Sequence, residues 1–173
     1  MRIAVISDTH DNIQNLEKVL RRIDGKVDII IHCGDYCAPF ISAMLVKLGL
    51  PTYGCLGNVD GDQKGLTELG GGNFNLVPLY GEYGQVKLDE RKIAYCHYPK
   101  LANLLAKNGE FDAVFYGHNH TAENKKVNNT LLLNPGAVCG ITAGVILGFD
   151  KKHKPASYAI YDTKTNSAEI VKI

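Results

Sequence analysis

The chain has 173 residues, of which 45% are hydrophobic and 21% are charged, and its formal net charge is +1. This composition is typical of a globular protein and excludes a long disordered chain. The longest apolar stretches, such as residues 143–149, are far shorter than the roughly 20 residues of a membrane span, and the length fits a single domain over residues 1–173.

Strands and helices alternate in the first third of the chain. The N-terminal run of Ile and Val is interrupted at Asp8, which is too early for the apolar core of a secretory signal, so the run predicts a buried strand. The periodicity gives strand 2–7, helix 15–23, strand 27–32, helix 39–48 and strand 51–56. This order implies parallel strands joined by right-handed crossovers.

The rest of the chain has the pattern of hairpins. Glycines at 70–72 predict a turn, which leaves at most a short helix over 64–69. Strands are expected at 85–88, 92–96, 113–116, 131–133, 156–162 and 168–173, with a helix at 101–107. Parallel units followed by hairpins predict an α/β fold, a four-layer α-β-β-α sandwich of two mixed sheets flanked by helices.

The cysteines indicate where the protein works. There are five, and their spacings match neither a CxxC zinc pattern nor a disulfide framework. Buried thiols in a reducing compartment explain them, so we expect a cytoplasmic protein. These residues are Cys33, Cys37, Cys55, Cys96 and Cys139.

Side chains that can bind a metal follow five of the predicted strands, where each apolar run ends. Ligands bind at the carboxyl ends of the strands in an open parallel sheet, so we expect these side chains to converge. Each alone would be a strand-end cap or a turn residue, but their ordered combination favours a site. The set is Asp8, His10, Asp35, Asn58, His97, His118 and His120.

The chemistry of this set predicts a metal centre. Imidazole together with carboxylate suits Mn, Fe, Zn or Ni better than Mg or Ca alone. Seven donors exceed what one tetrahedral zinc ion takes. One bridging carboxylate could divide them between two ions about 3.5–4 Å apart.

The order of these motifs resembles the calcineurin-like metallophosphoesterase family. The motifs are D-x-H at Asp8, G-D at Asp35, G-N-x-D at Asn58, a lone His97 and G-H-x-H at His118. The short length resembles the small bacterial and archaeal phosphodiesterase branch, whose fold the retromer scaffold subunit shares. The likeness extends over residues 1–173.

The resemblance implies a site with two divalent metal ions per chain, with Mn favoured and Ni, Zn, Fe or Co as alternatives. Asp8, His10 and His120 would bind the first ion, and Asp35 would bridge both. Asn58, His97 and His118 would complete the second. The implied reaction is hydrolysis of a small phosphoester, foremost a phosphodiester, by in-line attack of a hydroxide that bridges the metals.

Two other functions are compatible with this fold. One is a non-catalytic or weakly catalytic scaffold that binds proteins, although such a scaffold has no need of all seven donors. The other is a nuclease, which would need added length to hold the polymer. The near-neutral charge gives no evident nucleic-acid surface, the short apolar stretches predict no membrane partner, and the oligomeric state is left open. The basic tract at 151–154 is interpreted as an exposed turn.

The chain departs from the family pattern at two places. Val59 stands where many members have a histidine that assists the leaving group, and Val cannot transfer a proton. We therefore expect Asp60 to orient a ligand histidine from outside the site. Tyr98 and Pro99 follow His97 where the family has glycine, which alters the contacts on the phosphate side. Weaker candidates are His32, Cys37 and Lys100.

Overall fold

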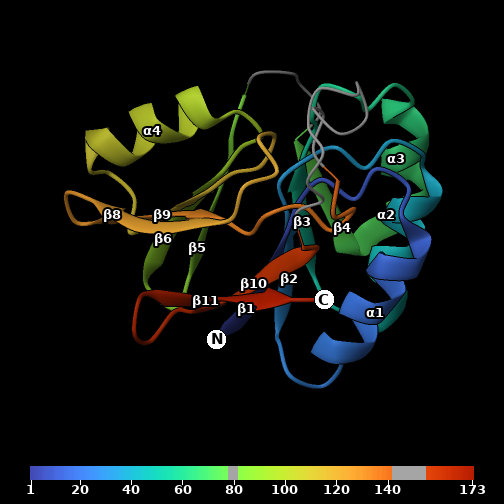
Figure 1. Ribbon diagram of the computed structural model, residues 1–173, viewed down its shortest axis with the longest axis horizontal. Coiled ribbons are helices and arrows are strands. Elements are labelled where there is room, and N and C mark those ends of the chain that lie inside the picture. Colours follow the sequence, from blue (N-terminus) through green and yellow to red (C-terminus); the bar gives the residue numbers. More distant parts are fainter. Residues whose placement is uncertain (78–81, 142–154) are drawn as a thin grey trace.

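The computed structural model describes residues 1–77, 82–141 and 155–173. Within these residues, four α-helices flank two β-sheets (Figure 1). The helices are α1 (Ile13–Ile23), α2 (Phe40–Leu45), α3 (Gln63–Gly70) and α4 (Pro99–Asn108), with short 3-10 turns at Val46–Leu48 and Gly71–Asn73. None of these helices is long and apolar enough to cross a membrane.

The first sheet has six strands in the order β11-β10-β1-β2-β3-β4. Its strands β1 to β4 are parallel neighbours, and β10 and β11 add an antiparallel hairpin at one edge. The parallel pairing predicted from the strand–helix alternation is therefore confirmed. The strands are β1 (Arg2–Ile6), β2 (Ile29–His32), β3 (Thr52–Cys55), β4 (Phe74–Val77), β10 (Ser157–Asp162) and β11 (Ser167–Lys172).

The second sheet has five strands in the order β5-β6-β7-β9-β8. Its three central strands are parallel, and the edge strands β5 and β8 pair antiparallel to them. The predicted hairpin turn at Asp89 and Glu90 joins β5 to β6. The strands are β5 (Gly84–Leu88), β6 (Arg91–Tyr95), β7 (Ala113–Phe115), β8 (Glu123–Val127) and β9 (Thr130–Asn134).

The buried side chains form three apolar layers. Strand β1 illustrates the alternation, because Ala4 and Ile6 pack among residues of α1, α2 and α3 whereas Ile3 and Val5 pack among residues of the second sheet. A third cluster lies between the second sheet and α4. Figure 1 shows α4 on one side of the molecule and α1, α2 and α3 on the other. The predicted four-layer sandwich is confirmed.

Two strands and the start of helix α1 differ from the sequence prediction. Strand β8 was missed because its sequence, ENKKV, is largely polar and exposed and shows no apolar period. Strand β4 was missed because it is short and follows directly on the glycine-rich 3-10 turn. Helix α1 begins two residues early because Asn12 caps it, accepting a hydrogen bond from the Asn15 amide. The basic tract at 151–154 lies outside the described residues.

Candidate metal centre

The structure brings the seven predicted donors together at the seam between the two sheets. The loops after β1, β2 and β3 come from the six-stranded sheet, and the loops after β6 and β7 come from the five-stranded sheet. Donors from both sheets are therefore adjacent, although His97 and Asp35 are separated by 62 positions in the chain. The site depends on the two sheets packing face to face.

The first group of donors contains two carboxylates and two imidazoles. Ligand atoms of Asp8, His10, Asp35 and His120 all lie within 4.8 Å of one another. His10 Nε2 is 3.1 Å from His120 Nε2, and His120 Nε2 is 3.3 Å from Asp8 Oδ1. Four donors of mixed nitrogen and oxygen chemistry at this spacing fit a divalent transition metal.

A second group of donors adjoins the first through Asp35. His97 Nε2 is 3.0 Å from Asn58 Oδ1, and His118 Nδ1 is 2.8 Å from the same oxygen. Asp35 Oδ2 is 3.4 Å from Nε2 of both His10 and His97. A single carboxylate oxygen is thus equidistant from an imidazole of each group, which fits a carboxylate shared by two ions.

Hydrogen bonds from the Nδ1 atoms of His97 and His120 to backbone carbonyls determine which ring nitrogen faces the other donors. The Nδ1–H of His97 donates to the Cys33 carbonyl at 2.8 Å, and the Nδ1–H of His120 donates to the Ile141 carbonyl. In this tautomer the lone pair of Nε2 points at the other donors. His118 differs because its Nδ1 is the nitrogen that faces Asn58 and His97.

Asp60 anchors the backbone of the loop that carries Asp35. Its fully buried carboxylate accepts hydrogen bonds from the amides of Asp35 and Gly57 at one oxygen, and of Tyr36 and Cys37 at the other, at 2.7–3.0 Å. The sequence predicts that Asp60 orients a ligand histidine. Its four hydrogen bonds to backbone amides hold the turn after β2 against the turn after β3.

Buried His32 also fixes the turn after β2. Its Nδ1 accepts a hydrogen bond from the Gly34 amide, and its Nε2 lies 3.3 Å from the Thr9 hydroxyl, which donates to the Asp35 carbonyl. Burial lowers the pKa of His32 to about 3, so the ring is neutral at physiological pH. These contacts support a role for His32 in positioning the loop that carries Asp35.

The backbone of the donor loops adopts the left-handed conformation repeatedly. Five of the seven donors have a positive φ, between 42° and 73°. Non-glycine residues adopt this region uncommonly, and such residues gather at functional sites whose surroundings hold them in place. They are Asp8, His10, Asp35, His118 and His120.

Burial and the two carboxylates act in opposite directions on the imidazoles. Burial lowers the pKa of His10, against the charges of Asp35 and Asp8. Burial is also the largest single effect on the pKa values of His97 and His120. The hydrogen bonds and charges of Asp35 and Asp8, together with the backbone carbonyls behind the rings, outweigh it, so both pKa values are raised, that of His120 to about 10. A divalent cation bound here would displace the protons that these imidazoles hold.

Sequence reasoning missed the role of Asn134, which fixes the loop after β7. Its buried amide donates to the Gly117 carbonyl at 3.1 Å and to Asn119 Oδ1 at 2.8 Å. The loop that is held carries both His118 and His120. The one signal in the sequence was the position of Asn134 directly before Pro135-Gly136, where an apolar run stops.

The two departures from the family pattern lie beside the second group. Val59 is 41% exposed and follows Asn58 directly, so an apolar side chain occupies the rim there. The ring of Tyr98 lies 5.0 Å from that of His118 and 5.1 Å from that of His97. Lys100 lies in the first turn of α4, and its side chain is exposed.

The hollows of the described surface only partly coincide with the donors. One hollow, of about 390 Å³, is lined by residues of β5 and β6 and by Phe111, and none of the seven donors lines it. A smaller one of about 180 Å³ includes His120 together with Ala122, Ser157 and Ile170. A metal site needs convergent ligands rather than a large volume, so the donor geometry defines the site.

The sequence matches the model of the calcineurin-like phosphoesterase superfamily domain over residues 1–166. It is 31% identical over 159 residues to phosphodiesterase MJ0936 of Methanocaldococcus jannaschii, which covers 88% of this chain and 95% of that protein. It is 25% identical to the probable metallophosphoesterase YsnB of Bacillus subtilis, over 98% of this chain and 89% of that one.

Solved structures show the same fold. An archaeal phosphodiesterase superposes with a TM-score of 0.85 at 26% identity, over the whole of both chains. Vps29 of Entamoeba histolytica in complex with zinc superposes with a TM-score of 0.69 at 16% identity, over 100% of this chain and 98% of that one. The family model and the sequence relatives establish that the chain belongs to the calcineurin-like phosphoesterase superfamily.

Proposed function

We propose that this chain is a phosphodiesterase that uses two divalent metal ions, with Mn²⁺ favoured, to hydrolyse a small phosphoester. The observation that carries the proposal is the position of Asp35 Oδ2, 3.4 Å from Nε2 of both His10 and His97. This is where a carboxylate shared by two ions would lie. A relative 31% identical to this chain is named a phosphodiesterase, which supports the diester preference.

The donors divide between the two ions as their spacing suggests. When bound, the ions would activate a water molecule for in-line attack and neutralise charge on the phosphate. Asp35 would bind both ions, and the carbonyls of Cys33 and Ile141 would keep His97 and His120 in the tautomer that presents Nε2. The first ion would take Asp8, His10 and His120, and the second would take Asn58, His97 and His118.

The residue after Asn58 determines which leaving groups can depart. Val59 exposes an apolar side chain at the rim and has no proton to give. A leaving group that receives no proton from the protein must depart as an anion, so the pKa of the alcohol or phenol that it forms controls the rate. We expect aryl phosphodiesters, which release weakly basic phenolates, to be hydrolysed faster than alkyl phosphodiesters. We further propose a cytoplasmic location and a small-molecule rather than polymeric substrate.

Hydrolysis of bis(4-nitrophenyl) phosphate by the purified chain tests the proposal. The metal-free protein should be inactive, and added Mn²⁺ should produce turnover that saturates as two ions bind. Turnover no higher than that of Mn²⁺ alone, with Ni²⁺, Zn²⁺, Fe²⁺ and Co²⁺ also ineffective, would rule the proposal out.

Asp35→Asn tests the shared carboxylate. Asn keeps the size of Asp but lacks the charge and the second oxygen, so turnover should fall by at least ~100-fold and one ion fewer should bind. Asp11→Asn is the matched control, because Asp11 is exposed in the same group of loops and the one described hydrogen bond of its carboxylate comes from the Ala38 amide. It should retain activity within about threefold. Full activity of Asp35→Asn would refute the shared position.

A protein-binding scaffold is the second candidate, because Vps29 structures share the fold. One of those structures contains zinc. Metal content alone therefore does not separate an enzyme from a scaffold of this fold. Turnover does, since a scaffold would bind the ion without accelerating hydrolysis of the diester.

A further inference from the structure

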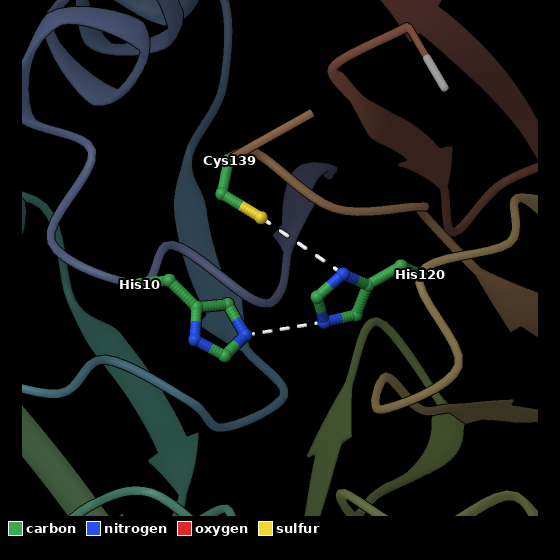
Figure 2. A group of neighbouring side chains, drawn as sticks. All are labelled: His10, His120 and Cys139. Atoms are coloured by element: carbon green, nitrogen blue, oxygen red, sulfur yellow. Dashed lines mark hydrogen bonds between the residues drawn. The ribbon is translucent and has the colours of Figure 1, made fainter. Parts of the chain in front are cut away.

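The imidazoles of the first group of donors have partners on the side that faces away from the other donors. Figure 2 shows His120 with His10 at one of its ring nitrogens and the Cys139 sulfur at the other. The Ile141 carbonyl accepts the Nδ1–H of His120, and the Cys37 sulfur lies 3.6 Å from His10 Nδ1. Both rings are therefore held from behind while Nε2 of each faces the other.

His118, in the second group, is held less firmly. Its backbone is fixed, because its amide donates to the Asp8 carboxylate at 3.1 Å, and its Nδ1 faces Asn58 Oδ1 at 2.8 Å. The residue is exposed, however, and within the described residues no backbone carbonyl accepts a hydrogen bond from its ring. Buried His97 has such a bond, to the Cys33 carbonyl. The orientation of the His118 ring therefore depends on other contacts.

The ring of Tyr98 provides such a contact. Its centroid lies 5.0 Å from that of His118, and the two rings meet edge to face at an interplanar angle of 61°. Aromatic pairs attract one another in this arrangement at separations of about 4.5–7 Å. The Tyr98 ring also lies 5.1 Å from that of His97, and the two imidazoles are 5.0 Å apart. Of these three rings, that of Tyr98 is the one that is not a proposed metal ligand.

The backbone of Tyr98 is fixed by its neighbours. Pro99 begins α4, and a residue that precedes proline is restricted to extended backbone, which agrees with φ of −88° and ψ of 133° at Tyr98. The Tyr98 carbonyl accepts a hydrogen bond from the Ala102 amide at 3.1 Å, in the first turn of the helix. The direction in which the Tyr98 side chain leaves the backbone is thereby set, toward the two imidazoles.

We propose that Tyr98 is a positioning residue of the second metal site. Its ring holds the His118 imidazole with Nδ1 turned toward Asn58 and His97, and so raises the affinity of this site for its ion. The inference rests on the metal centre proposed above. An exposed imidazole that is free to rotate must be ordered when the ion binds, which lowers affinity, whereas a ring that is already oriented avoids this loss. The described ring contacts of Tyr98 are with ligands of the second ion, so the first ion should bind independently of it.

Titration of the metal-free full chain with Mn²⁺, followed by electron paramagnetic resonance, tests the inference. Two Mn²⁺ ions that share a carboxylate are spin-coupled, and their spectrum differs from that of a single bound ion. The wild type should develop the coupled spectrum. Tyr98→Leu should bind the first ion within about threefold of the wild type and the second ~10–100-fold more weakly. At the Mn²⁺ concentration that fills both wild-type sites, this variant should show the spectrum of single ions.

Two variants serve as controls. Tyr98→Phe keeps the ring and removes only the hydroxyl, so it should retain the coupled spectrum and both affinities within about threefold. Tyr83→Leu removes an exposed tyrosine whose ring meets that of Phe111 edge to face at 5.9 Å, away from the donors, and it should also bind both ions as the wild type does.

A coupled spectrum of Tyr98→Leu at wild-type Mn²⁺ concentrations would overturn the role of Tyr98 and leave the two-metal phosphodiesterase intact. Equal weakening of both ions, or loss of the second ion in Tyr98→Phe as well, would also overturn it, because the effect would not belong to the ring. If Tyr98→Leu fails to fold, nuclear Overhauser contacts between the Tyr98 and His118 rings in the Zn²⁺-loaded wild type decide the question, and their absence refutes the inference. A wild type that binds no second ion would overturn the proposed function together with this inference.

Discussion

Replacing Asp60 by Asn should release the loop that carries Asp35, although Asp60 itself is not a proposed metal ligand. Each carboxylate oxygen of Asp60 accepts two backbone amides, from Asp35 and Gly57 at Oδ2 and from Tyr36 and Cys37 at Oδ1. Asn has one acceptor oxygen and one NH₂ donor. Whichever way its amide is oriented, two backbone N–H groups will face a donor.

The cost follows from the number of hydrogen bonds lost. A hydrogen bond to a charged group contributes about 1.5–3 kcal/mol, so two lost bonds cost roughly 3–6 kcal/mol. The neutral side chain recovers part of this, because burial raises the pKa of the Asp60 carboxyl and so disfavours its charge. We expect a net loss of about 2–5 kcal/mol in the free energy of unfolding. Since the freed turn carries Asp35, Mn²⁺ should also bind ~10–100-fold more weakly.

Urea unfolding of the metal-free chain and Mn²⁺ titration measure the two effects. Asp62→Asn is the control, because exposed Asp62 caps α3 through a single bond from the Gly65 amide, and Asn caps helices as well as Asp. It should change stability by about 0.5 kcal/mol or less. If Asp60→Asn matched this control in both stability and Mn²⁺ affinity, the four amide contacts would not be what holds the loop.

Two further substitutions probe the loops around the donors. A Cβ at Gly117 would lie 1.9 Å from Ser7 Oγ and 2.7 Å from Asp8 Oδ2, so Gly117→Ala should displace Asp8 and lower Mn²⁺ affinity ~10-fold or more. Gly61→Ala is the control, because its Cβ would meet no heavy atom within 4 Å, and it should leave Mn²⁺ affinity unchanged. Equal Mn²⁺ affinities of the two variants would refute the clash. His32 has its pKa lowered from 6.5 to about 3, so its contribution to stability is complete above pH 6.5 and is lost as pH falls, by up to ~1.4 kcal/mol per pH unit, because the unfolded chain takes up the proton first. Urea unfolding between pH 7 and 5 should show a shallower pH dependence in His32→Asn, and an unchanged slope would contradict a buried neutral ring.

The sandwich was predictable because its central strands are buried on both faces. Residues 3–6 and 29–31 are continuous apolar runs, and this pattern arises when a sheet is covered on each side. Edge strand β8 gives no such signal, because Lys125 and Lys126 point to opposite faces and both are exposed, so polar side chains are tolerated on either face. Hydrophobic pattern reports burial, so it finds the centre of a sheet more readily than its edge.

The donors were predictable from the ends of these same runs, whereas the groups that hold the donors were not. Asp8, Asp35 and His97 come two or three residues after the ends of β1, β2 and β6, strands that the hydrophobic pattern predicts. Asp60 and Asn134 act through backbone amides and carbonyls of other loops. Nothing in the type or spacing of a residue states which distant backbone groups it will meet after folding, so their roles emerge only from the packed loops.

The left-handed backbone at the donors connects these two levels. Asp and His are several-fold enriched among the non-glycine residues that adopt positive φ, so the side chains that bind metals are also those that tolerate this conformation. A tight left-handed turn at Asp8, Asp35 or His118 therefore needs no glycine at the donor position itself. The positions before Asn58 and His118 do need a glycine, because a Cβ at Gly57 would clash with Asp35 and a Cβ at Gly117 would clash with Asp8. Metal chemistry and backbone geometry thus select the same Gly-Asp, Gly-Asn and Gly-His pairs, which explains why short motifs identify the site while the loops that position it do not follow from sequence.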